Sequence, residues 1–355
     1  MRTRASYAWV VKKPGSRETV VMTLPSTMRA AVITQPGGPD VIAIESRPLP
    51  VPSASEILVR VRGSAINRAD LLQRIGRYPA PPGVPADIPG MEFAGEVAAL
   101  GGGVTAWSVG DRVCGLVGGG AHAEYLVTHE RTVALVPESL DWLIAGASPE
   151  VYITAYDAMV TQAGLRSGEV VLVHAVGSGV GLAAVQVAIA LGAMVYGTAR
   201  GVGKLDAARD MGMADGCQPG EPGWVAKAVL GWTGGRGADV VVDLVGGDYT
   251  AESLTAMAMK GRLMLIGALA GSKATVDLRA ILGKRLTVRG TVLRSRSLEE
   301  KILVTQVYER DVLPWLALGQ IVPRIDASFP LEAIADAHAL VEGNGTIGKV
   351  ALTIA

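Results

Sequence analysis

The sequence has very few cysteines and no excess of either charge. Only Cys114 and Cys217 occur among 355 residues. They are too few for a disulfide framework and are not spaced as a zinc site, so we expect a reducing, cytoplasmic environment. The 33 basic and 33 acidic residues give a formal net charge of zero. The chain therefore lacks the excess of positive charge that would predict nucleic-acid binding. No run of about 18 apolar residues predicts a membrane span.

Residues 170–182 are the most informative part of the chain, because VVLVHAVGSGVGL is an apolar run that leads into a glycine-rich segment. We expect a strand, a tight turn and a helix, since glycines let the backbone approach a phosphate and a helix N-terminus offers free N–H groups. The pattern continues with a helix, a strand and a helix over 183–191, 194–198 and 204–211. Glycines 177, 179 and 181 read G-x-G-x-G, which in a βαβ unit predicts a dinucleotide site. A tight turn without a ligand is the alternative.

The end of the second strand bears on which dinucleotide is bound. NAD sites place an Asp or Glu there, about 20 residues after the glycines. This chain reads GTARGVGK over 197–204, with no acid before Asp206. Arg200 offers a planar fork of donors and Lys204 a point charge, and both would attract a ribose phosphate. The sequence therefore favours NADPH, the alternative being two solvated residues that open a helix.

The length suits two domains. Residues 28–150 are strand-like and interrupted by glycine and proline turns, which is typical of a compact, barrel-like β domain. From residue 151 strands and helices alternate, and the apolar runs 239–244 and 262–267 indicate a parallel sheet. We expect residues 297–342 to be helical and 348–354 to be a strand. The domains would then be 28–150 with 291–355, and 151–290.

Residues 1–27 differ from the rest. They carry several basic residues but lack the apolar core of a secretory signal. Since MRAAVITQPGG from Met28 reads like the start of a domain, the extension is interpreted as an upstream start, an extra strand or hairpin (YAWVV and ETVVM), or a weak targeting segment.

Several stretches together carry a family resemblance. Besides the glycine-rich turn, they are SAINRADLLQRIGRYPAPPG (64–83), IPGMEFAGEV (88–97), PEVYITAYDA (149–158), DLVGG (243–247), GTVLRSRS (290–297) and IGKVALTI (347–354). The chain from Met28 onward resembles the zinc-free NADPH:quinone oxidoreductases of the medium-chain dehydrogenase/reductase superfamily. The resemblance implies an α/β protein with a GroES-like β-barrel catalytic domain, a Rossmann doubly wound parallel-sheet domain and usually a homodimer. It also implies hydride transfer from NADPH to quinones or related electron-poor enones.

The resemblance implies roles at individual positions. Asn67 corresponds to a residue near the nicotinamide and substrate, and Tyr78 to a tyrosine of the substrate cleft, so both are candidates for catalysis. The cofactor candidates from the resemblance are Asn67, Thr154 at the nicotinamide end, Ser178, Gly179 and Val180 in the pyrophosphate loop, Lys204 at the 2′-phosphate, Ile266 and Leu269 in the segment whose backbone faces the carboxamide, and Lys349 reaching toward the pyrophosphate. Arg200 replaces a small residue of the relatives and is a candidate for the 2′-phosphate by its charge alone. A tyrosine that packs on the adenosine phosphate in many relatives is Pro219 here.

No metal is expected. Zinc-dependent alcohol dehydrogenases need a Cys, a His and another Cys or acid, but the place where many carry Gly-His-Glu reads Gly90-Met91-Glu92, and no cysteine is near Asn67. Without a Lewis acid the acceptor must take hydride readily. A quinone does so because its quinol anion is delocalised, and positioning then matters most. A tyrosine hydroxyl and an amide could orient a carbonyl oxygen or relay the proton that follows.

Other interpretations remain open. An enoyl-thioester reductase acting on CoA or carrier-protein substrates belongs to the same superfamily, and an NADPH-binding sensor or structural protein with little turnover is a further alternative. Asn67 could be a turn amide bonded to backbone, and Tyr78 a packing aromatic. His174 and Asp243 are interpreted as structural.

Overall fold

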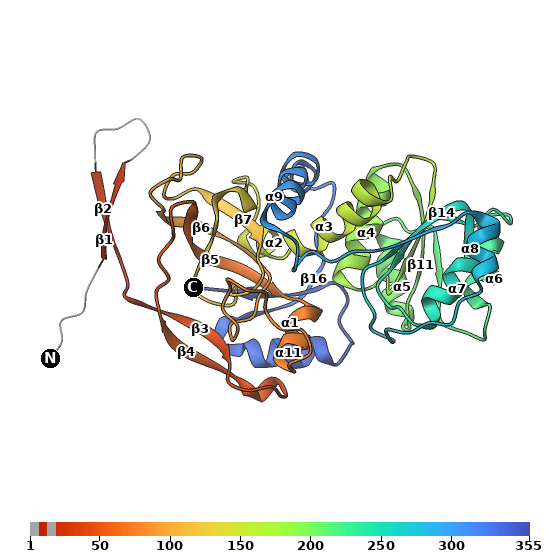
Figure 1. Cartoon of the computed structure of the whole chain (residues 1–355), viewed down its shortest axis with the longest axis horizontal. Helices are drawn as coiled ribbons and strands as arrows, with labels where there is room; N and C mark the ends of the chain where they lie inside the picture. Colours follow the sequence, from red (N-terminus) through yellow and green to blue (C-terminus); the bar gives the residue numbers. More distant parts are fainter. Residues whose placement is uncertain (1–6, 13–18) are drawn as a thin grey trace. The chain divides into compact units, whose positions relative to one another are not determined.

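The structure, a computed structural model, describes residues 7–12 and 19–355. The chain divides into two compact units (Figure 1). The first runs to Glu150 and takes in Arg294–Ala317 and Ile325–Ala355; the second consists of Val151–Leu293 and Leu318–Arg324.

The second unit contains a six-stranded, fully parallel sheet in the order β12-β11-β10-β13-β14-β15. Its strands are β10 (Val170–His174), β11 (Met194–Thr198), β12 (Asp215–Cys217), β13 (Ala238–Asp243), β14 (Met257–Leu265) and β15 (Thr287–Gly290). Its helices are α4 (Gly179–Ala190), α5 (Val202–Asp210), α6 (Trp224–Trp232), α7 (Asp248–Ala256) and α8 (Leu278–Lys284). In chain order the strands read 3-2-1-4-5-6, the doubly wound order. The α/β fold expected from the sequence is confirmed.

The strand order reverses between β10 and β13, and open α/β sheets bind ligands at such a switch point, beyond the carboxyl ends of the strands. All five residues of β10 are buried, because the strand lies in the middle of the sheet with covered faces. The glycine-rich turn that follows β10 therefore stands at the position where this fold holds a dinucleotide.

The first unit is built on antiparallel strands. Its larger sheet follows the path β16-β17-β5-β6-β7-β9, with β8 paired to β5, and β3 pairs with β4. These strands are β3 (Thr27–Ile33), β4 (Ile42–Pro48), β5 (Glu56–Ile66), β6 (Glu92–Leu100), β7 (Arg112–Leu116), β8 (Tyr125–His129), β9 (Val133–Leu135), β16 (Ile325–Pro330) and β17 (Lys349–Thr353). The remaining elements of this unit are α1 (Arg68–Arg74), α2 (Trp142–Gly146), α9 (Leu298–Val307), α10 (Leu313–Ala317), α11 (Ile334–Glu342), the short turns Pro39–Val41, Glu130–Thr132 and Leu331–Ala333, and the π-helical turn Tyr308–Val312. The helix α3 (Pro149–Tyr156) begins in this unit and continues into the second, to which the π-helical turn Asp157–Gln162 belongs.

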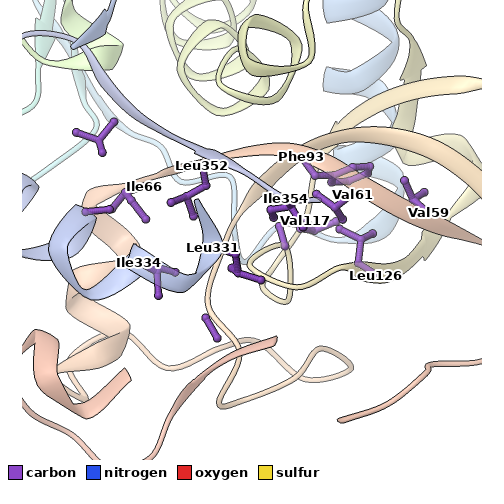
Figure 2. Close-up of a cluster of buried hydrophobic side chains, with 14 of the residues drawn as sticks. Val59, Val61, Ile66, Phe93, Val117, Leu126, Leu331, Ile334, Leu352 and Ile354 are labelled. Atoms are coloured by element: carbon purple, nitrogen blue, oxygen red, sulfur yellow. The ribbon is translucent and has the colours of Figure 1, made fainter. Parts of the chain in front are cut away.

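One apolar cluster forms the core of the first unit, and Figure 2 shows its side chains meeting from segments far apart in the chain. Phe93 of β6 and Val61 of β5 are completely buried, and Leu352 of β17 joins them. A buried aliphatic side chain contributes about 1.5–3 kcal/mol. This core fixes β5, β6 and β17, whose ends carry the polar residues described below.

The prediction that residues 297–342 are helical is wrong in part. Helices α9, α10 and α11 lie in this range, but Ile325–Pro330 forms β16, which pairs in parallel with β17. The segment alternates between half-buried and exposed residues, a period typical of an edge strand. Pairing with a distant strand outweighs the local helical context.

Near the N-terminus, β1 (Tyr7–Lys12) and β2 (Thr19–Leu24) pair antiparallel from Tyr7↔Leu24 to Lys12↔Thr19. The expected strand YAWVV falls on β1, and the TVVM part of ETVVM falls on β2, while residues 1–6 and 13–18 lie outside the described residues. Across the described chain, every helix is too short or too polar to cross a bilayer.

Candidate functional site

The turn after β10 joins strand and helix through close backbone contacts in the second unit. Ser178 begins α4, and its Oγ accepts a hydrogen bond from Gly181 N at 3.1 Å. A Cβ on Gly181 would lie 2.5 Å from Val176 O, so only glycine fits there. The first N–H groups of a helix have no acceptor within it. Those of Gly179 and Val180 therefore face outward at the positive end of the helix dipole, which suits a pyrophosphate.

Lys204 lies directly against this turn. A Cβ on Gly177 would lie 2.6 Å from Lys204 Cβ and 2.7 Å from Cγ, so the lysine stem covers the first glycine. Lys204 stands in the first turn of α5, right after β11. The sequence placed both residues at the cofactor, and the structure brings them into contact.

Arg200 is exposed and follows β11 by two residues. Its carbonyl oxygen accepts a hydrogen bond from Gln218 Nε2 at 2.6 Å. Its charge also acts on Tyr249 of α7, a residue that sequence reasoning missed: burial raises the pKa of the Tyr249 phenol, and Arg200 partly offsets this. A cation at the end of β11 suits a ribose phosphate better than an acid would.

The segment 266–271 is fixed by the turn after β13. The carboxylate of Asp243 accepts hydrogen bonds from the N–H groups of Val245 and Gly246, both at 2.9 Å, and from the Thr250 hydroxyl. The Asp243 carbonyl accepts from Ile266 N at 2.8 Å, and the Val245 carbonyl from Ala270 N at 2.8 Å. Asp243 is thus structural, as expected, and presents the backbone of 266–270. Leu269 in this segment is 57% exposed.

His174 ends β10 as a buried, neutral side chain. Its Nδ1 lies 2.8 Å from the hydroxyl of Thr198, and its Nε2 lies 2.7 Å from that of Ser253. Burial lowers the pKa of His174 to about 4, although the charge of Asp243 acts in the opposite direction. The histidine ties β10 to β11 and α7, which is the structural role expected from the sequence. Thr154, on α3, is 7% exposed.

In the first unit, Asn67 lies in a buried polar network at the end of β5. It is 6% exposed, and its Nδ2 donates to Glu92 Oε1 at 2.9 Å, while its Oδ1 accepts from Lys349 Nζ at 2.6 Å. Its backbone N–H donates to Asp70 Oδ2 at 2.7 Å. Both ends of the amide are therefore held by charged side chains and not by the turn backbone alone.

Glu92 and Lys349 form a buried ion pair within this network. Lys349 Nζ lies 2.7 Å from Glu92 Oε1, and the side chains are 4% and 0% exposed respectively. The other carboxylate oxygen accepts from Glu150 N at 2.9 Å. The sequence led us to expect that Lys349 reaches toward the pyrophosphate. In the structure its ammonium group donates hydrogen bonds to Asn67 and Glu92. Sequence reasoning missed the pair.

The donor set at this position does not fit zinc. A catalytic zinc needs about three side-chain ligands, but the chain offers Asn67 and Met91 here, and the oxygens of Glu92 are taken by Lys349, Asn67 and a backbone N–H. In the described part of the chain, no three His, Cys, Asp or Glu residues come together as a metal site.

Tyr78 lies in the loop after α1 and is a partly buried residue. Its backbone N–H donates to Leu72 O at 3.2 Å. The guanidinium carbon of Arg294 lies 4.9 Å from the ring centroid. Arg294 belongs to the GTVLRSRS stretch, to which the sequence assigned no role.

Two histidines that are far apart in the sequence also meet in the first unit. The rings of His122 and His338 lie 6.2 Å apart, edge to face. Arg74 Nη1 lies 3.5 Å from His338 Nδ1. Burial, then the charges of His122 and Arg74, lower the pKa of His338 to about 2. Nothing in the local sequence predicts this contact, because the residues come from separate segments.

Comparisons with known proteins agree with these features. Residues 53–138 match the family described as alcohol dehydrogenase GroES-like domain, and residues 179–308 match the family described as zinc-binding dehydrogenase. The human protein named quinone oxidoreductase is 30% identical over 333 residues, which cover 92% of this chain and 98% of that protein.

Solved structures give the same picture. A mycobacterial protein solved as a complex with NADPH has a TM-score of 0.81 and 28% identity, covering 92% of this chain and 99% of its own. A protein described as an NAD-dependent alcohol dehydrogenase has a TM-score of 0.82 and 32% identity, covering 92% and 100%. The matches span both units.

Proposed function

Because the chain belongs to the quinone oxidoreductase type of the medium-chain dehydrogenase/reductase superfamily, we propose that it transfers a hydride from NADPH to quinones or related electron-poor enones, without zinc. The family makes it an NAD(P)H-dependent oxidoreductase. The observation that carries the finer proposal is Lys204 packed on Gly177 of the dinucleotide turn, with no acid at the end of β11.

NADPH would be held along the second unit. The N–H groups of Gly179 and Val180, with Ser178, would bind the pyrophosphate, and Arg200 and Lys204 the 2′-phosphate. Thr154, Asn67 and the backbone around Ile266 and Leu269 would meet the nicotinamide end, with Lys349 acting on the pyrophosphate or through Asn67. The cofactor supplies the hydride.

On the substrate side, Asn67 and Tyr78 would orient a carbonyl oxygen of the acceptor. The Asn67 amide is pre-set by Glu92 and Lys349, and a fixed donor costs no reorganisation during the reaction. A phenol at Tyr78 would supply the proton that follows the hydride. The poor fit of the donor set to zinc supports an acceptor that needs no Lewis acid.

We also propose a homodimer in a reducing, cytoplasmic compartment. All four residues of the edge strand β15 are exposed, and an open edge is a template for pairing with a second copy. Both cysteines are free thiols, which fits a reducing environment.

The test is NADPH oxidation at 340 nm with an ortho-quinone, a para-quinone, a simple enone and an enoyl-CoA, with NADH run in parallel. Fast quinone turnover and a preference for NADPH support the proposal. Turnover with enoyl-CoA alone would move the function to thioester reduction. Tight NADPH binding without oxidation would identify a binding protein with little turnover.

A further inference from the structure

Arg294 is a buried cation whose hydrogen bonds join three separate segments of the first unit. It is 2% exposed. Its Nε donates to Gly118 O at 2.7 Å, its Nη1 to Tyr78 O at 3.1 Å, and its Nη2 to the side-chain oxygen of Gln73. The planar guanidinium can reach three acceptors at once because its donors point outward in a fixed fork.

The third acceptor extends this connection to the far end of the same loop. Gln73 is buried on α1, and its Nε2 donates to Ala86 O at 3.0 Å. Arg294 therefore binds the start of the loop at Tyr78 directly. It binds the end of the loop at Ala86 indirectly, through Gln73. The loop between them is rich in proline.

The glycine run 118–120 lets this loop lie close. A Cβ on Gly118 would lie 2.8 Å from Pro81 Cγ and 3.3 Å from a methyl of Val84. The same glycine gives its carbonyl to Arg294. The two loops are thus packed together and joined by one side chain.

The three acceptors of Arg294 are two carbonyls and an amide, all neutral. Burial lowers the pKa of Arg294, while the charges of Asp70 and then Tyr78 act in the opposite direction. Burying a charge without an ion-pair partner costs free energy. The three hydrogen bonds offset part of this cost, and an apolar residue here would leave the Gly118 and Tyr78 carbonyls and the Gln73 amide oxygen without this donor.

The same guanidinium also contacts the ring of Tyr78. The Arg294 guanidinium carbon lies 4.9 Å from the ring centroid, within the range of a cation–π contact, and the same side chain holds the Tyr78 carbonyl. We propose that Arg294 is the positioning residue of Tyr78, fixing both its main chain and its ring so that its hydroxyl meets the substrate. This rests on the proposed function of Tyr78.

The kinetic test compares Arg294→Met, Arg294→Lys and Tyr78→Phe with the combined variant Arg294→Met/Tyr78→Phe in quinone reduction. We expect Arg294→Met to lower kcat by about 10- to 100-fold, as misplaced catalytic groups do, with the Kd for NADPH unchanged. Arg294→Lys keeps the charge but loses the fork, so it should lose most of the same activity. When Tyr78→Phe is already present, adding Arg294→Met should lower kcat by less than about twofold relative to Tyr78→Phe alone.

Arg112 offers a matched control in the same unit. Its guanidinium lies 3.9 Å from the ring centroid of Trp142, and its Nη2 donates to Leu140 O at 2.5 Å. Arg112→Met removes a comparable arginine, aromatic contact and carbonyl bond at another place. It should leave kcat close to that of the unaltered protein.

A second measurement, limited digestion with trypsin, detects opening of the loop independently of enzyme activity. Arg77 is exposed and directly precedes Tyr78, so trypsin can cut between them once the loop opens. We expect Arg294→Met to speed this cut at least fivefold relative to the cut after Arg279, whose side chain is 91% exposed. Arg112→Met should leave the ratio unchanged.

Three results would overturn the proposal: an unchanged cutting ratio in Arg294→Met, full activity in Arg294→Lys, or equal losses from Arg294→Met with and without the Tyr78 hydroxyl. If the unaltered protein reduces no quinone, the proposed function fails, and the trypsin ratio still decides whether Arg294 holds the loop. If Tyr78→Phe alone is fully active, the role of Tyr78 fails, and with it the purpose assigned to Arg294.

Discussion

Lys349 Nζ lies 2.7 Å from Glu92 Oε1, and the two side chains are 4% and 0% exposed. The residues stand 257 positions apart, at the ends of β17 and β6. Between them they hold the amide of Asn67. The pair orients the amide by a fixed charge on each side, because the carboxylate accepts from Nδ2 and the ammonium donates to Oδ1.

Removing one member of this ion pair should lower the free energy of unfolding more than replacing both members. Lys349→Met leaves a buried carboxylate, and we expect a loss of about 3–5 kcal/mol in the free energy of unfolding. Adding Glu92→Gln should recover part of that loss, because the remaining groups are neutral. Urea unfolding of both single variants and the double variant gives the coupling energy. Strictly additive losses would show that the two groups do not act as a pair.

The cofactor preference should depend on Lys204. Removing a charged donor to a phosphate costs about 1.5–3 kcal/mol. We therefore expect Lys204→Ala to raise the KM for NADPH by about 10- to 100-fold and to leave the KM for NADH nearly unchanged. Lys227→Ala, on the exposed side of α6, is the matched control. Equal effects on both cofactors would remove Lys204 from the 2′-phosphate.

Gly181 should tolerate no side chain. A Cβ there would lie 2.5 Å from Val176 O and 2.6 Å from Ala175 O, both rigid backbone atoms. We expect Gly181→Ala to destabilise the protein by about 1–3 kcal/mol and to weaken NADPH binding, measured by cofactor fluorescence.

Gly231 of α6 provides the contrast, since a Cβ there meets no atom within 4 Å. Gly231→Ala should stabilise the protein by about 0.5–1 kcal/mol through helix propensity. A loss of stability in Gly231→Ala equal to that in Gly181→Ala would show that the clash at Val176 O is not the cause.

Stability should fall in mild acid because of His174. Its pKa is lowered to about 4 by burial, while in the unfolded chain it returns to about 6.5. Below about pH 6.5 the His174 imidazole binds a proton in the unfolded chain but stays neutral in the native state. His174 therefore lowers the free energy of unfolding by up to about 1.4 kcal/mol per pH unit until its folded pKa is reached. His338, with a folded pKa of about 2, adds a decrease of its own over the same range.

Urea unfolding between pH 7.5 and pH 4.5 measures this slope. His174→Asn should start less stable at pH 7.5, since hydrogen bonds to Thr198 and Ser253 are lost, but its stability should decline less steeply. A slope identical in the two proteins would mean that His174 is not one of the titrating groups.

The sequence predicted the features that are local in the chain. The strand, glycine turn and helix from Val170 to Ala190 could be predicted because their pattern is contiguous, and so could the cation at the end of β11. It did not predict the strand Ile325–Pro330, which depends on a distant partner. Nor did it reveal the contact of Glu92 with Lys349, or the hold of Arg294 on Tyr78. Each of these contacts joins residues that are far apart in the sequence and that the fold brings together. The pattern of apolar and polar residues along the chain does not predict which distant residues will meet.

The most direct test of the central proposal is a single-turnover experiment with the protein in excess over NADPH and a para-quinone. The account predicts that absorbance at 340 nm is lost in step with quinone, one NADPH for each quinone reduced. An enhanced fluorescence of bound NADPH with no loss of absorbance after quinone is added would contradict it.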